Sequence, residues 1–384
     1  MRVLIAFDKF KDALSAAEAC AVAAAALRER HPDWELDLCP LTDGGEFFCE
    51  TLTHAARAEL RPQNVTGPRN GAVTAPIGLI AAQNVPADAR RRLASENRDS
   101  KIENSLAIVD VASASGLALL ASELRNPWHT TTYGTGELLG QAADLGAGAI
   151  LLGLGGSATN DLGCGALAAL GCKFFDASGT IIARPTPAFW ASIHRIDATA
   201  ARPLPPLHLA CDVTNPLLGP SGATATFGPQ KGLPREDVAR LEAQAARLAA
   251  LLCAAYHQPL ALSEVPGTGA AGGIAFGLMV AYGARLVPGF DLVSDWLALP
   301  ARLAAADLVL TGEGRFDATS LGGKGPGSLL AEARRRGKAG HVFAGSLGVS
   351  AEPQLHAISP AGLPLAEALP RTAELLTAAV TRVL

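Results

Sequence analysis

The chain has 384 residues, of which 49% are hydrophobic and 18% charged, and its formal net charge at pH 7 is -4. This length exceeds that of an ordinary single domain and leaves material for two cores. The slightly acidic balance, with Lys and Arg dispersed rather than gathered into a stripe, argues against nucleic acid as the main partner. No apolar run reaches the roughly 20 residues of a membrane span, so no membrane association is expected.

The cysteines and histidines show no spacing typical of a metal site. The seven cysteines are odd in number, lack Cys-x-x-Cys spacing and lie mostly within apolar runs, which indicates reduced thiols. The eight histidines are scattered along the chain. The first residues lead into a strand with no charged leader or cleavage site before it. These features predict a cytoplasmic protein.

The first predicted strand, residues 2–7, is followed by a polar corner from Asp8 to Asp12. Ser15 and Glu18 have the spacing of a capping box, so we expect an alanine-rich helix from there to about Arg30. Strand, polar corner and helix make a β-α unit. In sheets built from such units, ligands bind at the carboxyl ends of the strands.

A second predicted strand, residues 36–39, leads into Asp43-Gly44-Gly45-Glu46. If the two strands are neighbours, their carboxyl ends meet at one edge of the sheet. The polar side chains expected at that edge are Asp8, Lys11, Asp43 and Glu46.

The next part of the chain mixes strand signals with a polar segment. Residues 60–80 are typical of a β-hairpin with Pro68-Arg69-Asn70-Gly71 as its turn. Residues 83–105 are polar and aperiodic. Because no aromatic side chains are interleaved with their charges, we interpret them as a solvated, disorder-prone insertion rather than a binding patch. A core strand is expected again at 107–111.

The most informative segment follows the apolar run 149–152 and is called the glycine-rich turn (residues 153–161) below. It reads Gly153-Leu154-Gly155-Gly156-Ser157-Ala158-Thr159-Asn160-Asp161 and precedes a small-residue helix from about Gly165. Glycines let a backbone approach an anion closely, and the first turn of a helix presents N–H groups to it. Asp161 would repel a bare phosphate. We therefore expect it either to hold a divalent cation or to accept a proton from an attacking hydroxyl.

Two later strands also end in polar residues. Strand 207–211 leads to Asp212, and strand 307–310 leads to a corner at 311–317 that contains Glu313 and Arg315. The N- and C-terminal segments thus share one pattern, in which each strand is followed by a polar corner.

This pattern predicts an α/β fold with two α/β domains. Residues 1–75 and 285–384 are expected to form a discontinuous, Rossmann-like parallel-sheet domain. Residues 76–284 are expected to form a second α/β domain inserted between those segments.

No single corner is specific, because each could be a tight turn with a satisfied polar cap. Their recurrence carries more weight, since converging carboxylates, cations and backbone amides are what magnesium-dependent phosphoryl transfer requires. The Walker motif is absent, because the residues around Lys324 lack its spacing and its hydroxyl residue. The loop set of protein kinases is absent too.

Taken together and in order, several blocks of the sequence are far more specific than any one corner. They are Asp8–Lys11, Asp43–Glu46, Thr130–Glu137, Gly155–Asp161, Ala210–Leu217, Phe227–Gly232, Gly267–Gly273, Thr311–Asp317 and Ala344–Gly348. In these blocks the chain resembles the bacterial glycerate kinase family, type 1. It departs from the family pattern at Asp12, where a glycine is usual, at Phe47-Phe48, where smaller residues are usual, and in the longer 83–105 segment.

The resemblance implies ATP-dependent phosphorylation of D-glycerate in a cleft between two α/β domains, and the polar corners indicate Mg²⁺ as the metal. The expected product is 2-phosphoglycerate, formed by direct in-line transfer. The alternatives are 3-phosphoglycerate as product, or another small hydroxy acid as acceptor, since Asp12 and Phe47-Phe48 could reshape the pocket. The expected partners are the small molecules glycerate and ATP.

The polar corners supply candidates for each role. Arg315 is the first candidate for the glycerate carboxylate, because its guanidinium pairs with two oxygens at once, and Lys11 is the second. The base is one of Asp43, Asp161 and Asp212. Further assignments are Asp8 and Glu313 to the substrate, Lys11 to catalysis as well, Asp161 and Asp212 to the metal, and Gly155, Gly156, Ser157, Thr159, Asn160 and Lys324 to ATP.

Two readings from other classes compete with a kinase. A ligand sensor could keep the polar corners and lack turnover, although a sensor has no need of an acidic base. A nicotinamide dehydrogenase is disfavoured because no Gly-x-Gly-x-x-Gly opens the helix after the first strand.

Overall fold

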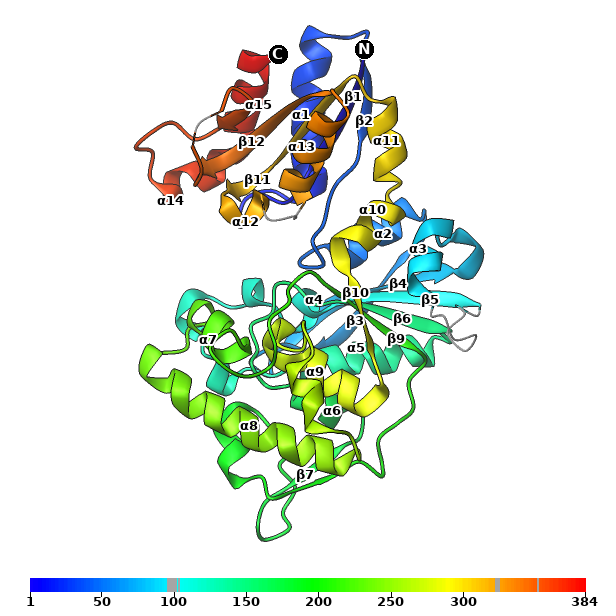
Figure 1. Cartoon of the computed structure of the whole chain (residues 1–384), viewed down its shortest axis with the longest axis vertical. Coiled ribbons are helices and arrows are strands. Elements are labelled where there is room, and N and C mark those ends of the chain that lie inside the picture. The colour runs from blue at the N-terminus through cyan, green and yellow to red at the C-terminus, as the bar shows by residue number, and fades with distance from the viewer. Residues whose placement is uncertain (95–101, 103, 322–324, 351) are drawn as a thin grey trace. The chain divides into compact units, whose positions relative to one another are not determined.

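The computed structural model describes residues 1–94, 102, 104–321, 325–350 and 352–384. These residues form two compact α/β units (Figure 1): a first unit of residues 1–43 and 293–384, and a second unit of residues 44–292. The predicted boundaries were wrong for residues 44–75 and 285–292, which belong to the second unit. Helix α10 (Gly289–Trp296) contains the second of the two boundaries.

The first unit is built on a parallel sheet with the strand order β13-β12-β11-β1-β2. Its strands are β1 (Arg2–Phe7), β2 (Glu35–Leu38), β11 (Leu308–Phe316), β12 (Ala339–Leu347) and β13 (Leu355–Ala357). Its helices are α1 (Ala16–Arg30), α11 (Leu299–Ala305), α12 (Ala318–Leu321), α13 (Gly325–Arg335), α14 (Leu365–Ala368) and α15 (Thr372–Val383).

Alternation of side chains along the strands gives this sheet two apolar faces. On one face, Ile5 and Phe343 pack with apolar residues of α1 and α15. On the other face, Val342 and Ala344 pack with Leu330 of α13. A sheet covered on both faces suits parallel strands, whose apolar runs must be buried on both sides.

The capping box predicted for α1 is confirmed. Ser15 Oγ accepts a hydrogen bond from the Glu18 N–H, and the Glu18 carboxylate accepts one from the Ser15 N–H. The segment that was predicted as a polar corner, 311–317, is a strand as far as Phe316. It continues β11 because β12 pairs alongside it, with Arg315 opposite Ser346.

The second unit is built on a mixed sheet with the strand order β10-β9-β6-β5-β4-β3. Its strands are β3 (Leu60–Thr66), β4 (Ala72–Ala81), β5 (Ser105–Asp110), β6 (Ala149–Gly153), β9 (Leu207–Cys211) and β10 (Arg285–Pro288), with a small separate pair, β7 (Lys173–Phe175) and β8 (Arg195–Asp197). Its helices are α2 (Phe48–Ala55), α3 (Ala87–Leu93), α4 (Val111–Ser115), α5 (Tyr133–Asp144), α6 (Cys164–Ala169), α7 (Ala223–Phe227), α8 (Val238–Ala255) and α9 (Ala270–Tyr282).

Strands β5, β6, β9 and β10 are parallel, whereas β3 and β4 form an antiparallel hairpin that joins β5. This hairpin is the one predicted at 60–80. Its pairing with β5 places residues 44–75 in the second unit. The 83–105 segment is also more ordered than predicted, because residues 87–93 form α3. Residues 95–101 and 103 of that segment lie outside the described residues.

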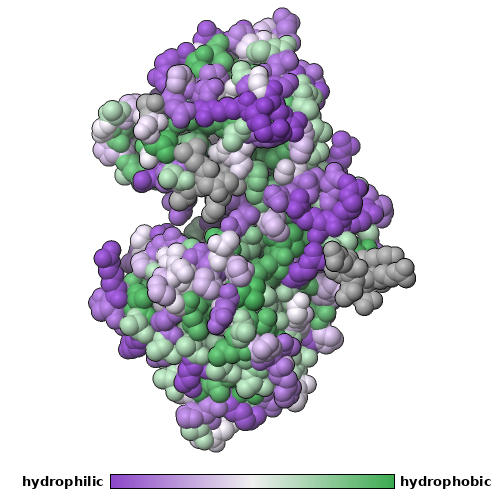
Figure 2. All heavy atoms as spheres, in the orientation of Figure 1, coloured by the Kyte–Doolittle hydropathy of each residue, from purple (hydrophilic) through white to green (hydrophobic). Residues whose placement is uncertain are grey.

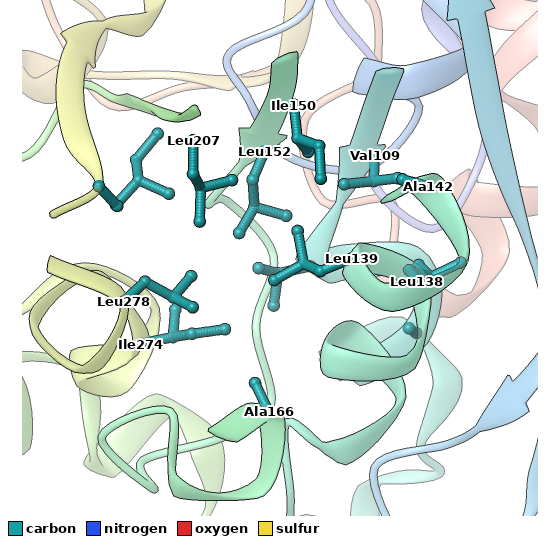
Figure 3. Close-up of a cluster of buried hydrophobic side chains, with 14 of the residues drawn as sticks. Val109, Leu138, Leu139, Ala142, Ile150, Leu152, Ala166, Leu207, Ile274 and Leu278 are labelled. Carbon is teal, nitrogen blue, oxygen red and sulfur yellow. The ribbon is translucent and has the colours of Figure 1, made fainter. Parts of the chain in front are cut away.

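The core of the second unit lies between the parallel strands and two helices (Figure 3). Ile150, Leu152 and Leu207 project from the strands toward Leu139 of α5 and Leu278 of α9. These side chains are at most 4% exposed. The core fixes the ends of β6 and β9, from which the glycine-rich turn and Asp212 begin.

The face of the molecule in Figure 2 mixes hydrophilic and hydrophobic residues in both units. Among the described residues, no helix has the length and apolarity needed to cross a membrane.

Candidate functional site

The first unit contains a cavity of about 630 Å³ at the carboxyl ends of β1 and β11. Asp8, Lys11 and Asp43, which were predicted for this sheet edge, line it, whereas Glu46, which was predicted there too, belongs to the second unit and is not part of the lining. Its charged lining consists of Asp8, Lys9, Lys11, Asp12, Asp43, Glu313 and Arg315, and Ser346 of β12 adds a hydroxyl. The parallel sheet brings these groups together from four separate parts of the sequence.

Asp8 is the most buried charged group of this cavity. The residue is 9% exposed, and its Oδ1 accepts a hydrogen bond of 2.7 Å from the Lys9 N–H. Burial and, to a smaller extent, the nearby carboxylate of Asp43 raise the pKa of Asp8 to about 7, against the opposing effect of Lys9. A carboxyl group with such a pKa can exchange a proton near neutral pH.

Asp43 and Glu313 are two further carboxylates of the cavity. The Lys9 ammonium lies 3.3 Å from Asp43 Oδ1, with the two side chains 16% and 38% exposed. Burial raises the pKa of Glu313, and a hydrogen bond from Ser320 opposes that shift. Lys9 was not among the predicted site residues. Its position directly after Asp8, at the end of a buried strand, was the signal for it.

The cationic part of the cavity is more open. Arg315 is an exposed side chain on β11, 70% accessible, whose Nε lies 3.3 Å from Asp317 Oδ2. Lys11 is exposed as well. Both can therefore reach a small anion from solvent, which fits the predicted substrate-binding role.

In the second unit, the glycine-rich turn packs closely against other backbone. The Gly155 N–H donates to Gly44 O at 2.8 Å, and a Cβ on Gly155 would come within 2.5 Å of the Gly45 Cα. Gly156 has φ +73, a conformation that favours glycine, and a Cβ there would meet Glu46 Oε1 at 2.9 Å. These glycines thus serve contacts within the protein, so their presence does not by itself establish a phosphate site.

Asp161 is fully buried and surrounded by hydrogen-bond donors. Its Oδ2 accepts from the N–H and the hydroxyl of Thr132, both at 2.8 Å, and from the Gly165 N–H at 3.2 Å. Its Oδ1 accepts from the Gly163 N–H at 3.2 Å. Burial raises the pKa of Asp161 and these bonds lower it. The contacts make Asp161 an anchor for the starts of α5 and α6, and they lend no support to the predicted roles of base and metal ligand.

The predicted phosphate contacts Ser157, Thr159 and Asn160 are also buried, at most 7% exposed. Lys231, which was not predicted, donates from Nζ to Ser157 Oγ at 2.7 Å and to Thr159 O at 2.6 Å. Asn160 Nδ2 donates to Thr224 Oγ1 at 3.1 Å. The only sequence signal for Lys231 was its place in the block Phe227–Gly232. Lys324 lies outside the described residues.

Asp212 follows β9 and is only partly buried. Its Oδ1 accepts a hydrogen bond of 2.9 Å from the Phe290 N–H at the start of α10. Among the described residues, no group of three or more His, Cys, Asp and Glu side chains is placed to hold a metal ion.

The departures from the family pattern have local explanations. Asp12 has φ +61, a backbone conformation that glycine adopts more easily, which accounts for glycine as the usual residue there. Phe48 is fully buried, and a Cβ on Gly153 would lie 2.7 Å from its ring, so Phe48 packs under the glycine-rich turn. Phe47 is exposed and has φ +67. Of these residues, Asp12 alone lines the cavity of the first unit.

A parallel sheet whose strands end in carboxylates and cations beside an open cavity is typical of α/β proteins that bind a small ligand there. The chain belongs to the glycerate kinase family, whose model matches residues 3–384. The resemblance noted in the sequence is thereby confirmed. Membership makes the protein an enzyme, a phosphotransferase with an alcohol group as acceptor.

Individual relatives agree with this assignment. Glycerate 2-kinase from Escherichia coli (strain K12) is 36% identical over 350 residues, covering 90% of this chain and 86% of that protein. Glycerate kinase from Bacillus subtilis (strain 168) is 34% identical and covers 97% of this chain and 94% of that protein. The crystal structure of a protein assigned as glycerate kinase 2 from Salmonella typhimurium LT2 has a TM-score of 0.73 at 36% identity, covering 100% of this chain and 97% of that chain.

Proposed function

We propose that the protein phosphorylates D-glycerate with ATP and forms 2-phosphoglycerate by direct in-line transfer. Family membership supports the reaction, and the relative from Escherichia coli named glycerate 2-kinase supports the position of transfer. The observation that carries the proposal is the cavity of the first unit, which combines open cations with a carboxyl group of pKa about 7. 3-Phosphoglycerate is the alternative product.

The acceptor binds in the cavity of the first unit. Arg315 pairs with the glycerate carboxylate, and Lys11 supplies a second positive charge. Both side chains are exposed, so they can contact a glycerate anion that is still hydrated. Glu313 and Ser346 border the same space and can orient the hydroxyl groups of glycerate.

Asp8 is the base in this proposal and takes precedence over Asp43, Asp161 and Asp212. It is the charged residue of the cavity that is most buried, and its pKa of about 7 lets it accept a hydroxyl proton near neutral pH. Asp43 assists by its negative charge, which raises the proton affinity of Asp8. Lys9 limits that effect through its contact with Asp43.

ATP binds through the glycine-rich turn of the second unit, and Asp212 would hold Mg²⁺. Asp212 fits a magnesium ligand because it is an only partly buried carboxylate at a strand end, and magnesium bound with substrate phosphates needs one or two carboxylates. When bound, the ion would offset the negative charge of the phosphates. The predicted location of transfer, in a cleft between the two domains, stays a prediction.

Phosphorus NMR of the purified protein with ATP, Mg²⁺ and D-glycerate tests the function directly. L-glycerate, glycolate and tartronate serve as parallel acceptors. A phosphoester signal that requires D-glycerate is expected, and its proton coupling distinguishes the 2-phosphate from the 3-phosphate. ATP binding without phosphorylation of any acceptor would overturn the proposal and favour a ligand sensor.

A further inference from the structure

Lys231 is a buried lysine that the proposed mechanism does not use. It ends the short 3₁₀ helix Pro229–Lys231, which follows α7, and the residue is only 3% exposed. Lysine is almost never buried to this degree without partners, because removing an ammonium from water is costly. The contacts of the Lys231 ammonium must therefore offset the cost of its burial.

The ammonium of Lys231 bridges two points of the glycine-rich turn. It donates to the side chain of Ser157 and to the backbone carbonyl of Thr159, which lie on either side of Ala158. Both bonds are short, at 2.7 and 2.6 Å, as expected for charge-assisted hydrogen bonds. A single side chain thus fixes the backbone direction of this part of the turn.

The same supporting segment holds the next residue of the turn. Thr224 of α7 accepts the hydrogen bond from Asn160 Nδ2. Hydrogen bonds therefore connect residues 157–160 to α7, through Thr224, and to the following 3₁₀ helix, through Lys231. The bond with Thr224 is neutral, whereas the bonds from Lys231 come from an ammonium group.

A carboxylate of the turn itself, that of Asp161, favours the charged form of Lys231. Burial lowers the pKa of Lys231 to about 7, and without the carboxylate of Asp161 this pKa would be lower still. Asp161 is held in place by Thr132, Gly163 and Gly165. A positive charge held against the turn favours an anion bound there, in the way that a helix N-terminus does.

We propose that Lys231 is a positioning residue, which holds the glycine-rich turn in its phosphate-binding form and adds positive potential there. This inference rests on the proposed function, in which the turn binds the phosphates of ATP. Lys231 does not touch the substrate. Its loss should therefore weaken the binding of the triphosphate much more than it changes the handling of glycerate.

The test compares K231M with the wild type, since methionine keeps the length and apolar stem of the side chain and removes the charge. K173M is the matched control, because Lys173 is an exposed lysine of the same unit. The measurements are KM for ATP, KM for D-glycerate and, by titration calorimetry, the affinity for ATP and for inorganic tripolyphosphate. Circular dichroism and thermal unfolding show whether each variant is folded.

For K231M, we expect KM for ATP to rise by about tenfold or more and the tripolyphosphate affinity to fall by a similar factor. KM for D-glycerate should stay within about threefold of the wild type, and K173M should match the wild type throughout. A folded K231M with an unchanged KM for ATP would overturn the inference. So would an equal rise in both KM values, because it would indicate a general structural role.

S157A provides a second test if K231M does not fold. It removes one acceptor of the ammonium and leaves the bond to the Thr159 carbonyl, so it should raise KM for ATP by a smaller factor than K231M. An unchanged KM for ATP in folded S157A would count against the positioning role.

The calorimetry separates this inference from the proposed function. If the wild type binds ATP and tripolyphosphate but phosphorylates no acceptor, the proposed function fails while weaker binding by K231M still supports the inference. If the wild type binds neither compound, the turn is not a phosphate site and both fail.

Discussion

The cavity of the first unit and the glycine-rich turn of the second unit use similar residues in opposite ways. In the cavity, Asp8, Asp43 and Glu313 line an open volume of about 630 Å³. In the turn, Asp161 is fully buried and accepts four hydrogen bonds from the protein. Under the proposed function, a carboxylate after a strand serves chemistry in the cavity and architecture in the turn. What decides is the number of donors that the rest of the fold directs at it.

Substitution of Asp8 by Asn sharpens the comparison most. We expect kcat to fall by a factor of about 100 or more, because the amide cannot accept the hydroxyl proton. For the wild type, kcat/KM should rise with pH through about 7, since only the ionised carboxylate acts as base. Steady-state kinetics between pH 5.5 and 9 check both points. A variant that keeps more than about a tenth of kcat would remove Asp8 as the base.

The same substitution should make the protein more stable at neutral pH. The pKa of Asp8 is raised from 3.8 to about 7 in the folded protein, so the unfolded chain releases this proton more readily. The stability contribution of the protonated group is present below pH 3.8 and is lost as the pH rises through 7. Thermal unfolding at pH 8 should therefore give a higher Tm for Asp8→Asn than for the wild type, and a lower Tm would contradict this account.

Substitution of Asp161 by Asn should affect stability rather than catalysis, and it should lower the stability. Whichever way the amide turns, its N–H group faces donors of Thr132 or Gly163, and Lys231 loses the carboxylate that favours its charge. We expect a loss of about 1–3 kcal/mol in the free energy of unfolding, measured by denaturant titration. A variant with wild-type stability and kcat reduced a hundredfold would restore Asp161 as a candidate base.

The contrast between Asp8 and Asp161 also shows which structural features could be predicted from the sequence. Most strands, the capping box of α1 and the gathering of Asp8, Lys11 and Asp43 at the edge of the first unit's sheet follow from local patterns and agree with the structure. Glu46 was predicted at the same edge, but it belongs to the second unit. The role of Asp161 depends on Thr132, which lies 29 residues earlier in the chain. Local spacing carries no information on such a contact.

The same limit explains the other differences. The hairpin of β3 and β4 was recognised from its turn. Its pairing with β5, however, depends on tertiary contacts that local sequence does not encode, so the predicted domain boundary at residue 75 was wrong. Lys231 was missed because it reaches Ser157 across 74 residues of sequence. Lysine on a glycine-flanked loop is ordinarily solvated, and only the fold shows that this one is buried.

Arg315→Ala should affect the acceptor alone and by a smaller amount than the loss of the base. We expect KM for D-glycerate to rise by about tenfold or more, as expected for the loss of a charged contact with a carboxylate, and KM for ATP to stay close to the wild type. Arg335→Ala is a suitable control, since Arg335 is an exposed arginine of the same unit that pairs with Glu332. A fall in kcat with an unchanged KM for glycerate would show that Arg315 does not bind the carboxylate.

The smallest expected effect concerns Asp12, which combines a left-handed backbone conformation with a place in the lining of the cavity. Asp12→Gly relieves the backbone cost of φ +61, although glycine also gains freedom in the unfolded chain, so the net gain in stability should be only about 0.5 kcal/mol. Both Asp12→Gly and Asp12→Asn remove a negative charge beside the proposed site for an anionic acceptor, and both should lower KM for glycerate about twofold.

Because asparagine tolerates this conformation better than most residues but still carries a Cβ, only the glycine variant should gain stability. Equal stability of the two variants would show that the conformation of Asp12 costs the fold nothing. If KM for glycerate falls in Asp12→Gly but not in Asp12→Asn, the backbone conformation at residue 12, rather than its charge, affects glycerate binding.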